Sequence, residues 1–132
     1  MAPLTSSRRT QRRTSDLFGF PVKAATTIQL GALVVLAAGL AVPASTALNL
    51  VPVGVAKSYL DNSAGADGDQ TVEVETGTFA FINNATSINL THVGSPAYMV
   101  DDQTVDATDG TGTRSPVGII MDVNDAGVWV KI

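Results

Sequence analysis

Short segments of alternating apolar and polar residues run through most of the chain, and turn residues separate them. The clearest is Thr71–Glu75, where two valines alternate with two glutamates before the turn Thr76-Gly77. A period of two places the valines on one face of a β-strand and the glutamates on the other. The same reasoning predicts strands at about 28–36, 40–44, 51–60, 79–81, 96–100, 104–107, 117–123 and 128–132.

Polar, glycine-rich segments mark the connections between these strands. Residues 61–69 (DNSAGADGD) and 107–113 predict loops, and the tetrapeptide at 124–127 predicts the turn of a final hairpin. We expect a short helical turn within 83–93, capped by Thr86 or Ser87. Many short strands with regular turns are typical of a small barrel or sandwich. The expected fold class is therefore mainly β, as a small β-barrel.

The first 23 residues lack this periodicity. They contain four arginines, followed by an apolar plug of three residues: Arg8, Arg9, Arg12 and Arg13, then Leu17, Phe18 and Phe20. We expect an extended basic arm over residues 1–23 and a single β-rich domain over residues 24–132.

The most apolar segment, 28–42, allows two interpretations. It carries no charged residue, a basic region precedes it, and small residues follow up to Ala47. That combination is typical of a cleavable secretory signal peptide covering residues 1–47, and Arg12-Arg13 suggests a twin-arginine variant. A membrane-spanning helix fits less well, because the apolar run is shorter than the roughly 20 residues that such a helix needs.

An internal repeat favours the other interpretation, in which this segment belongs to the fold. GALVVLAAGLAVPA from Gly31 and GSPAYMVDDQTVDA from Gly94 each start with glycine, and Pro-Val-Gly follows at Pro52 and again at Pro116. The second copy contains three aspartates, so it cannot be a membrane helix. Both copies predict strand, tight turn, strand, loop and strand. In the first copy the turn falls near Ala38-Gly39.

The net charge of −4 conceals a division between the two parts of the chain. The arginines of the arm are opposed by one acid, Asp16, whereas residues 24–132 contain eleven acids and three basic residues. A basic arm on an acidic body indicates different partners for the two parts, and the body should repel nucleic acid. The chain has no cysteine, which excludes disulfides, thiolate nucleophiles and Cys-based metal sites.

Residue patterns for catalysis are missing from the sequence. His92 is the only histidine, and no serine lies in a GxSxG elbow that would complete a triad. The acidic stretches at 61–69 and 101–109 lack EF-hand spacing, so solvated turns are favoured over calcium sites. Glu73 and Glu75 are expected to share an outward face, not a cleft. We therefore predict no enzyme activity, no catalytic or metal-binding residues and no cofactor.

The arginines and Trp129 are the candidates for partner binding. Arginine pairs contact phosphates or carboxylates, but the arm lacks interleaved aromatic residues and any nucleic-acid-binding signature. Docking of the arm on an acidic protein surface is therefore favoured. In the last strand Trp129 is expected on the face opposite Val128 and Val130, where it either anchors an interface or covers one open end of a barrel.

Eight short motifs follow one another along residues 24–132. In chain order they are Gly31-Ala32-Leu33-Val34, Pro52-Val53-Gly54, the loop 62–69, Val72-Glu73-Val74, Gly77-Thr78-Phe79, GSPAY at 94–98, Asp101-Asp102-Gln103 and GVWVKI at 127–132. In this order and spacing they resemble the head decoration (capsid cement) proteins of tailed bacteriophages.

The resemblance implies a tulip- or barrel-like β module on the outer surface of a phage capsid. Such proteins bind where major capsid protein subunits meet, commonly as trimers, and secure the shell against the pressure of packaged DNA. The expected partners are the major capsid protein and further copies of the chain, with no direct contact to nucleic acid or membrane. An arm of about 20 residues reaches on the order of 65 Å when fully extended, far enough to touch a neighbouring subunit. An exported envelope protein with a cleavable signal is the alternative.

Overall fold

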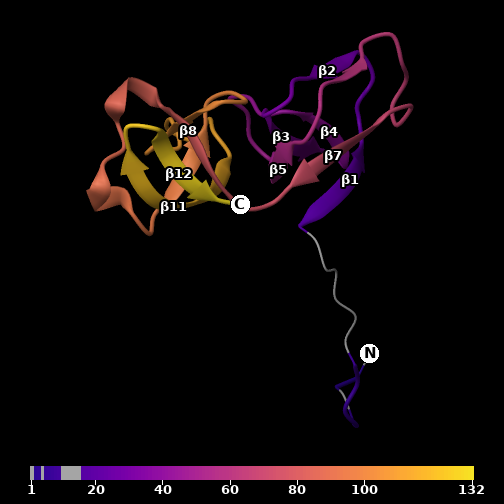
Figure 1. The fold of residues 1–132 in the computed structure, drawn as a ribbon, viewed down its shortest axis with the longest axis horizontal. Coiled ribbons are helices and arrows are strands. Elements are labelled where there is room, and N and C mark those ends of the chain that lie inside the picture. The colour runs from indigo at the N-terminus through magenta and orange to yellow at the C-terminus, as the bar shows by residue number, and fades with distance from the viewer. Residues whose placement is uncertain (1, 4, 10–15) are drawn as a thin grey trace.

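A computed structural model of the chain describes residues 2–3, 5–9 and 16–132 (Figure 1). Strands dominate these residues, and the expected mainly β fold with a small barrel is confirmed. The elements are, in chain order, β1 (Leu17–Pro21), β2 (Thr26–Ile28), β3 (Leu33–Ala37), β4 (Leu40–Pro43), β5 (Val51–Ala56), β6 (Leu60–Asn62), β7 (Thr71–Glu75), β8 (Thr78–Asn83), the 3₁₀ turns η1 (Asn84–Thr86) and η2 (Leu90–His92), β9 (Pro96–Met99), β10 (Thr104–Asp106), β11 (Pro116–Asn124) and β12 (Gly127–Lys131).

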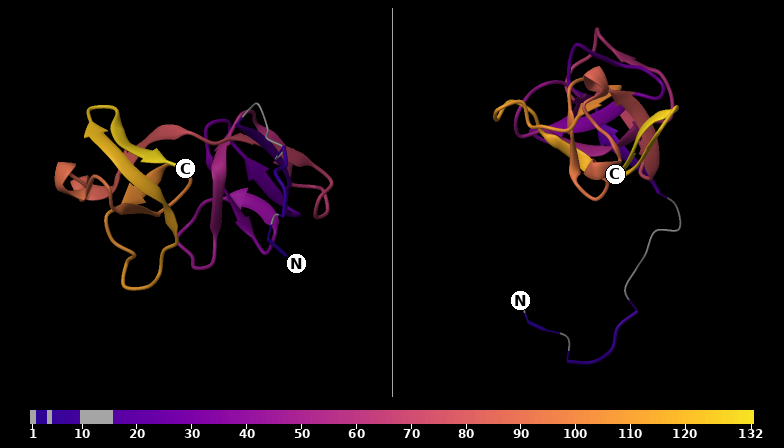
Figure 2. Two further views of the ribbon diagram at one scale, coloured as in Figure 1. Left: turned by 90° about the horizontal axis from the view of Figure 1, so that it is seen from below. Right: turned by 90° about the vertical axis from the view of Figure 1, so that its left-hand side faces the viewer.

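Ten of the described strands fall into two units with the same strand order. The sheet of the first unit runs β1-β7-β5-β3-β4, and the closed barrel of the second runs β8-β12-β11-β9-β10. Parallel pairing of β8 with β10 closes the barrel, and a parallel bridge between Val22 and Ala41 joins the two edges of the first sheet at the equivalent place. The units lie side by side along the long axis of the molecule (Figures 1 and 2). The internal repeat thus belongs to a duplicated five-stranded unit.

The two Pro-Val-Gly triplets occupy equivalent places in these units. Gly54 on β5 and Gly118 on β11 each pair with the strand that starts their own copy of the repeat, β3 or β9. A Cβ atom at either glycine would collide with a backbone carbonyl, that of Glu75 in the first unit and that of Lys131 in the second. Glycine in a strand permits this close approach of another backbone. The repeated motif therefore marks one packing constraint that occurs twice.

The apolar segment at 28–42 owes its composition to burial on two sides. β3 and β4 form the predicted hairpin around Ala38 and Gly39, which have φ values of 50° and 84°. Leu33, Val34 and Val35 have no exposed surface. Val34 packs inside the first unit, whereas Leu33 and Val35 pack against the barrel of the second unit. A strand covered on both faces reads as a continuous apolar run instead of an alternating one.

Two hydrophobic cores follow from this arrangement. The core of the first unit contains Val22, Ile28, Ala32, Val34, Ala41, Ala56, Val72 and Val74. The core of the barrel contains Phe81, Ile88, Ala97, Met99, Val105, Val117, Ile120, Val128 and Val130, and Leu33, Val35 and Ala44 of the first unit join it. Ser115 adds a polar link, since its hydroxyl donates to the Ala47 carbonyl (2.7 Å) and accepts from the Leu50 N–H (3.1 Å). The second core is therefore also the interface between the units.

The body begins earlier than the expected boundary between residues 23 and 24. Leu17–Pro21 form β1, which pairs antiparallel with β7 and places Phe18 opposite Val74 and Phe20 opposite Val72. Both phenylalanines pack against the first core. The apolar residues assigned to the base of the arm are therefore a strand of the body, and the arm ends before residue 17.

Three other local predictions need correction. The strand expected at 28–36 is interrupted, because the chain turns at Gly31 (φ 84°) between β2 and β3. The strand expected at 51–60 is divided into β5 and β6. The helical segment near 83–93 consists of two 3₁₀ turns, and Asn89 caps the second by accepting the Thr91 N–H at 2.9 Å.

Candidate functional site

The basic arm is the first candidate for contact with a partner. The described N-terminal segment, residues 5–9, lies apart from both units (Figures 1 and 2), and Arg8 and Arg9 within it are exposed. Neither belongs to the two ion pairs found among the described residues. Arg12 and Arg13 lie outside the residues that the structure describes. Two exposed guanidinium groups on a segment outside the strands suit carboxylates on another molecule, which arginine binds through paired hydrogen bonds.

Trp129 lies on the outer face of the barrel in the second unit. It is half-buried on β12, between Ala80 of β8 and Asp122 of β11. Its indole N–H donates to the Asn124 side-chain oxygen at 3.0 Å, so the ring also braces the hairpin of β11 and β12. The valines on either side of it face the core. This placement fits a residue at the edge of an interface better than a lid over the end of the barrel.

An apolar patch on the second barrel was not anticipated from the sequence. It consists of four large side chains that are 42–66 % exposed: Leu90, Val93, Ile119 and Met121. They surround the junction of η2 with β11, where the Gly94 N–H donates to the Ile120 carbonyl at 2.8 Å. Val93 immediately precedes this hydrogen bond, and Ile119 and Met121 flank it on β11. The hydrogen bond therefore fixes the two halves of the apolar patch beside each other.

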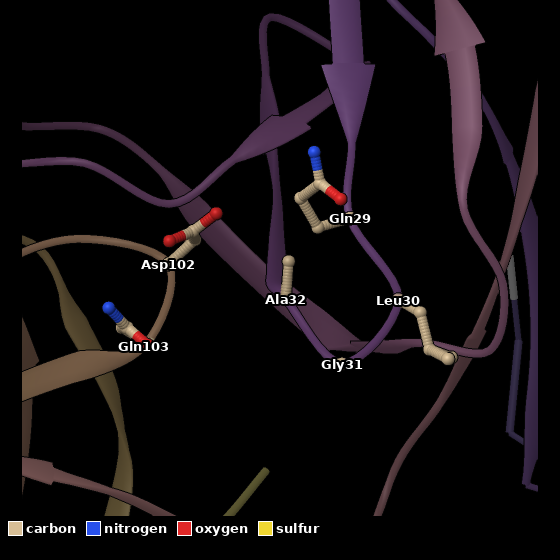
Figure 3. A pocket seen from close by; sticks show the side chains of 6 residues that line it. All are labelled: Gln29, Leu30, Gly31, Ala32, Asp102 and Gln103. Carbon is tan, nitrogen blue, oxygen red and sulfur yellow. The ribbon is translucent and has the colours of Figure 1, made fainter.

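A shallow polar pocket of ≈ 260 Å³ opens between the two units (Figure 3). The turn from β2 to β3 supplies Gln29, Leu30, Gly31 and Ala32, and the turn from β9 to β10 supplies Asp102 and Gln103. Burial, and after it the neighbouring Asp101 carboxylate, raises the pKa of Asp102 above its ordinary value. The Asp102 carbonyl also accepts the Leu33 N–H at 2.8 Å, which ties the two turns together. The lining offers hydrogen bonds but no nucleophile with a base beside it.

His92 serves η2 as part of a capping box. Its Nδ1 accepts the Asn89 N–H at 3.0 Å, while the Asn89 side chain accepts N–H groups of the same turn. Such reciprocal hydrogen bonds satisfy the free donors at the start of a helical turn. Nδ1 is thereby occupied by the backbone, which argues for a structural role of this histidine.

We expect His92→Ala to lower the free energy of unfolding by about 0.5–1 kcal/mol, the usual cost of a lost cap. His92→Gln should recover most of that loss, because glutamine also serves at this position of a capping box. Urea unfolding followed by circular dichroism compares the three proteins. Equal losses in both variants would contradict the capping role.

A second polar cluster holds the loop between β10 and β11. Asp106 accepts hydrogen bonds from the Asn84 side chain (2.7 Å) and from the Thr108 N–H (3.1 Å). It also forms an ion pair with Arg114, whose Nη1 lies 3.4 Å from the Asp106 Oδ2. Burial acts to raise the pKa of Asp106, but the hydrogen bonds from Asn84 and Thr108, together with Arg114, outweigh it and leave the pKa lowered. The charged form is therefore favoured in the folded protein. The cluster holds the loop in place, and its hydrogen bonds keep the Asp106 carboxylate engaged instead of free to act as a general acid.

We expect Asp106→Asn to destabilise the protein by about 1 kcal/mol at pH 7, since it weakens hydrogen bonds made by a charged group. A carboxyl group with a lowered pKa in the folded state stabilises the protein at pH values above its ordinary pKa of about 3.9. That contribution to the free energy of unfolding is lost as the pH falls through the folded-state pKa. The difference between wild type and variant should therefore disappear in acid. Urea unfolding at pH 7 and at pH values of about 2–4 measures it, and a constant difference would disprove the role of the charge.

The acidic loops use their carboxylates locally. Asp61 accepts the Ser63 N–H at 2.9 Å, and hydrogen bonds from Ser63 lower its pKa. Asp67 accepts the Ala24 N–H at 2.8 Å, and Asp69 accepts from Ala66 at 2.9 Å. In the described part of the chain no group of three or more His, Cys, Asp or Glu side chains is placed to hold a metal ion. These aspartates therefore shape turns.

Comparison of the chain with protein-family models, with curated proteins and with solved structures finds no match. Among residues 2–3, 5–9 and 16–132, no helix has the length and apolar character needed to cross a bilayer. Three surfaces of the described residues suit contact with a partner: the arm, the outer face around Trp129 and the apolar patch.

Proposed function

We propose that this chain is a capsid decoration protein, which binds the outer surface of an icosahedral phage head and stabilises contacts between major capsid protein subunits. The observation that carries the proposal is the exposed basic segment with Arg8 and Arg9, which precedes a rigid acidic body made of two β units. This combination suits a protein that attaches by contact area and charge. Its action requires no chemical step.

The charge distribution supports an acidic protein surface as the docking site of the arm. Residues 24–132 carry eleven acids and three basic residues, a net charge of −8, so the body is repelled by nucleic acid and by anionic lipid. The arm alone has the opposite sign. Exposed ion pairs contribute only about 0–1 kcal/mol each, so the arginines steer and orient the protein while apolar contacts supply the larger share of the binding free energy.

The proposed effect on the capsid is thermodynamic. A protein that contacts two subunits at once binds only the assembled shell, and by mass action it stabilises that state over the dissociated one. Three copies around one point where subunits meet would multiply the contacts, and a homotrimer on the particle is part of the proposal. The place of action is the outer surface of the virion.

An exported envelope protein is the second candidate, and the fold gives it less support. Cleavage after Ala47 would remove β1 to β4, including the fully buried Leu33, Val34 and Val35. The remaining strands would lose the hairpin on which both cores depend. Mass spectrometry of the intact protein separates the candidates, because decoration requires Met1 or Ala2 to be retained and export predicts a start near Leu48.

The test of the proposed function is binding to undecorated capsids of the cognate phage. Replacing Arg8, Arg9, Arg12 and Arg13 with alanine should weaken binding by about 10- to 100-fold at low salt, since each exposed pair contributes a fraction of a kcal/mol. The loss should shrink as salt rises towards 0.5 M, because screening removes the contribution in wild type too.

Co-sedimentation with the particles across a salt series measures the bound fraction. A matched control replaces Lys23 and Lys57, two exposed cations of the first unit, with alanine. The control should bind like wild type. Failure of the wild-type protein to bind any capsid would reject decoration as the function, and equal loss in both variants would show that net charge, not the arm, matters.

A further inference from the structure

We propose that the apolar patch of Leu90, Val93, Ile119 and Met121 is a second docking surface for the shell. It would contact a capsid subunit other than the one that the arm holds. The inference rests on the proposed function and deepens it, because it makes each copy of the protein bivalent. The expected occupant is an apolar protein surface on the major capsid protein.

The position of the apolar patch supports a contact separate from the arm. The patch belongs to the second barrel, whereas the arm leads into β1 of the first unit (Figure 1). Because the two units share a core through Leu33, Val35 and Ala44, the patch keeps a fixed position relative to β1, the strand that follows the arm. A preorganised body with contacts on different units can bridge neighbouring subunits with little further loss of conformational freedom on binding.

Backbone hydrogen bonds fix the positions of the segments that carry the apolar patch. Backbone hydrogen bonds from Gly94 to Ile120 (2.8 Å) and from Ile120 to Ser95 (3.0 Å) join η2 to β11. A register shift between Ile120 and Asp122 interrupts the pairing of β11 with β12 at this point. Ile119 and Met121 project outward on either side of Ile120, as alternate residues of a strand do. Ile120 is fully buried, while Met121 beside it is 48 % exposed.

The size of the apolar patch indicates which partner it fits. Four partly exposed aliphatic side chains present on the order of a few hundred Å², the range in which a monomer's largest patch is often functional. A stable interface between two proteins needs about 800 Å² from each. The patch is therefore too small to hold a free dimer by itself, and it suits an accessory contact in which the arm supplies the rest.

Lipid is a poor alternative occupant, because the acidic body opposes anionic membranes. Asp122 and Lys131 border the patch on β11 and β12, and both are exposed. Charges of both signs around an apolar centre are typical of the rim of a protein–protein interface. The partner surface is thus expected to be apolar at its centre and mixed in charge at its edge.

The experiment compares Leu90→Ser/Met121→Ser with Leu48→Ser/Val51→Ser. The control residues are similarly exposed, at 54 % and 55 %, but lie on the first unit. We expect the patch variant to raise the dissociation constant for undecorated capsids at least tenfold, and the control less than threefold, since linked contacts gain affinity through effective concentration. Combining the patch variant with deletion of residues 1–15 should abolish decoration.

Thermal unfolding and sedimentation velocity of the free proteins complete the test. Both double variants should melt within a few degrees of wild type, because all four side chains are exposed, and single Leu90→Ser and Met121→Ser variants provide a milder comparison. Patch and control variants that bind the capsid equally would overturn the inference and leave the proposed function standing. A patch variant that changes the free oligomeric state would also overturn it, since the occupant would then be a second copy. Wild-type protein that binds no capsid would reject both proposals.

Discussion

Replacing Gly118 with alanine should destabilise the protein by about 2–4 kcal/mol, at the upper end of the cost of overpacking. A Cβ atom at this position would overlap the backbone carbonyl of Lys131 on β12 and crowd a methyl group of Val130. Backbone atoms in a paired strand cannot move aside as a flexible side chain does. The strain must therefore separate β11 from β12, whose pairing carries one side of the barrel core.

Gly19→Ala is the matched control for this substitution. Gly19 also lies in a strand, but a Cβ atom there would meet only the Thr71 side-chain methyl, at 3.2 Å. We expect a change within about 1 kcal/mol. Urea unfolding followed by circular dichroism and by fluorescence of the single tryptophan, Trp129 on β12, gives both values. If Gly118→Ala proves as stable as Gly19→Ala, the close approach of the strands is not the reason for the glycine.

Gly54→Ala tests whether the two units obey the same rule. The clash with the Glu75 carbonyl is the counterpart of the one at Gly118, and a φ of 139° adds a backbone conformation that alanine disfavours. A loss similar to that of Gly118→Ala is expected. The sequence shows both glycines within Pro-Val-Gly, but only the structure supplies the reason, because the colliding carbonyls belong to other strands, β7 and β12.

The local pattern of apolar and polar residues is enough to predict the strands that alternate or that belong to the repeat. Thr71–Glu75 has the predicted bounds of β7, and the hairpin at Ala38 and Gly39 follows from the repeat. The repeat was seen over three strands of each unit. The other strands correspond in position but not in sequence, and they differ most at their outward positions. Glu73 and Trp129, for example, lie at corresponding places on β7 and β12, each flanked by two core valines.

The first strand and the apolar patch could not be predicted in this way. β1 is five residues long, and its partner β7 lies some fifty residues further along the chain, so no local signal joins them. In the run Val-Gly-Ile-Ile-Met at 117–121, apolar residues fill every position except the glycine, which reads as a buried strand. In the structure Ile120 is buried, while Ile119 and Met121 on either side of it are exposed. Because all three positions are apolar, the sequence does not show which face of this strand is covered.

Deleting residues 1–15 should leave both units folded, whereas deleting residues 1–21 should unfold the first unit. The longer deletion removes β1 and with it Phe18 and Phe20, which are partly buried against the first core and contribute at most the roughly 1.5–3 kcal/mol of a fully buried side chain each. It also uncovers Val72 and Val74 of the first core. The combined loss is comparable with the total stability of a small domain, about 5–15 kcal/mol. A deletion through residue 20, which the sequence alone predicts to be harmless, should therefore be damaging.

Limited digestion with trypsin measures this difference, because each unit contains its own cleavage site. Lys57 follows β5 in the first unit, and Arg114 precedes β11 in the second, so each reports on the folding of its own unit. In wild type we expect cleavage confined to the arginines of the arm, and in the protein lacking residues 1–15 no early cleavage at all. In the protein lacking residues 1–21, cleavage after Lys57 should become at least tenfold faster, since proteolysis follows the population of the open form. Rapid cleavage after Lys57 in the shorter deletion would show that residues 1–15 belong to the fold, and the arm would then no longer be free to bind a capsid.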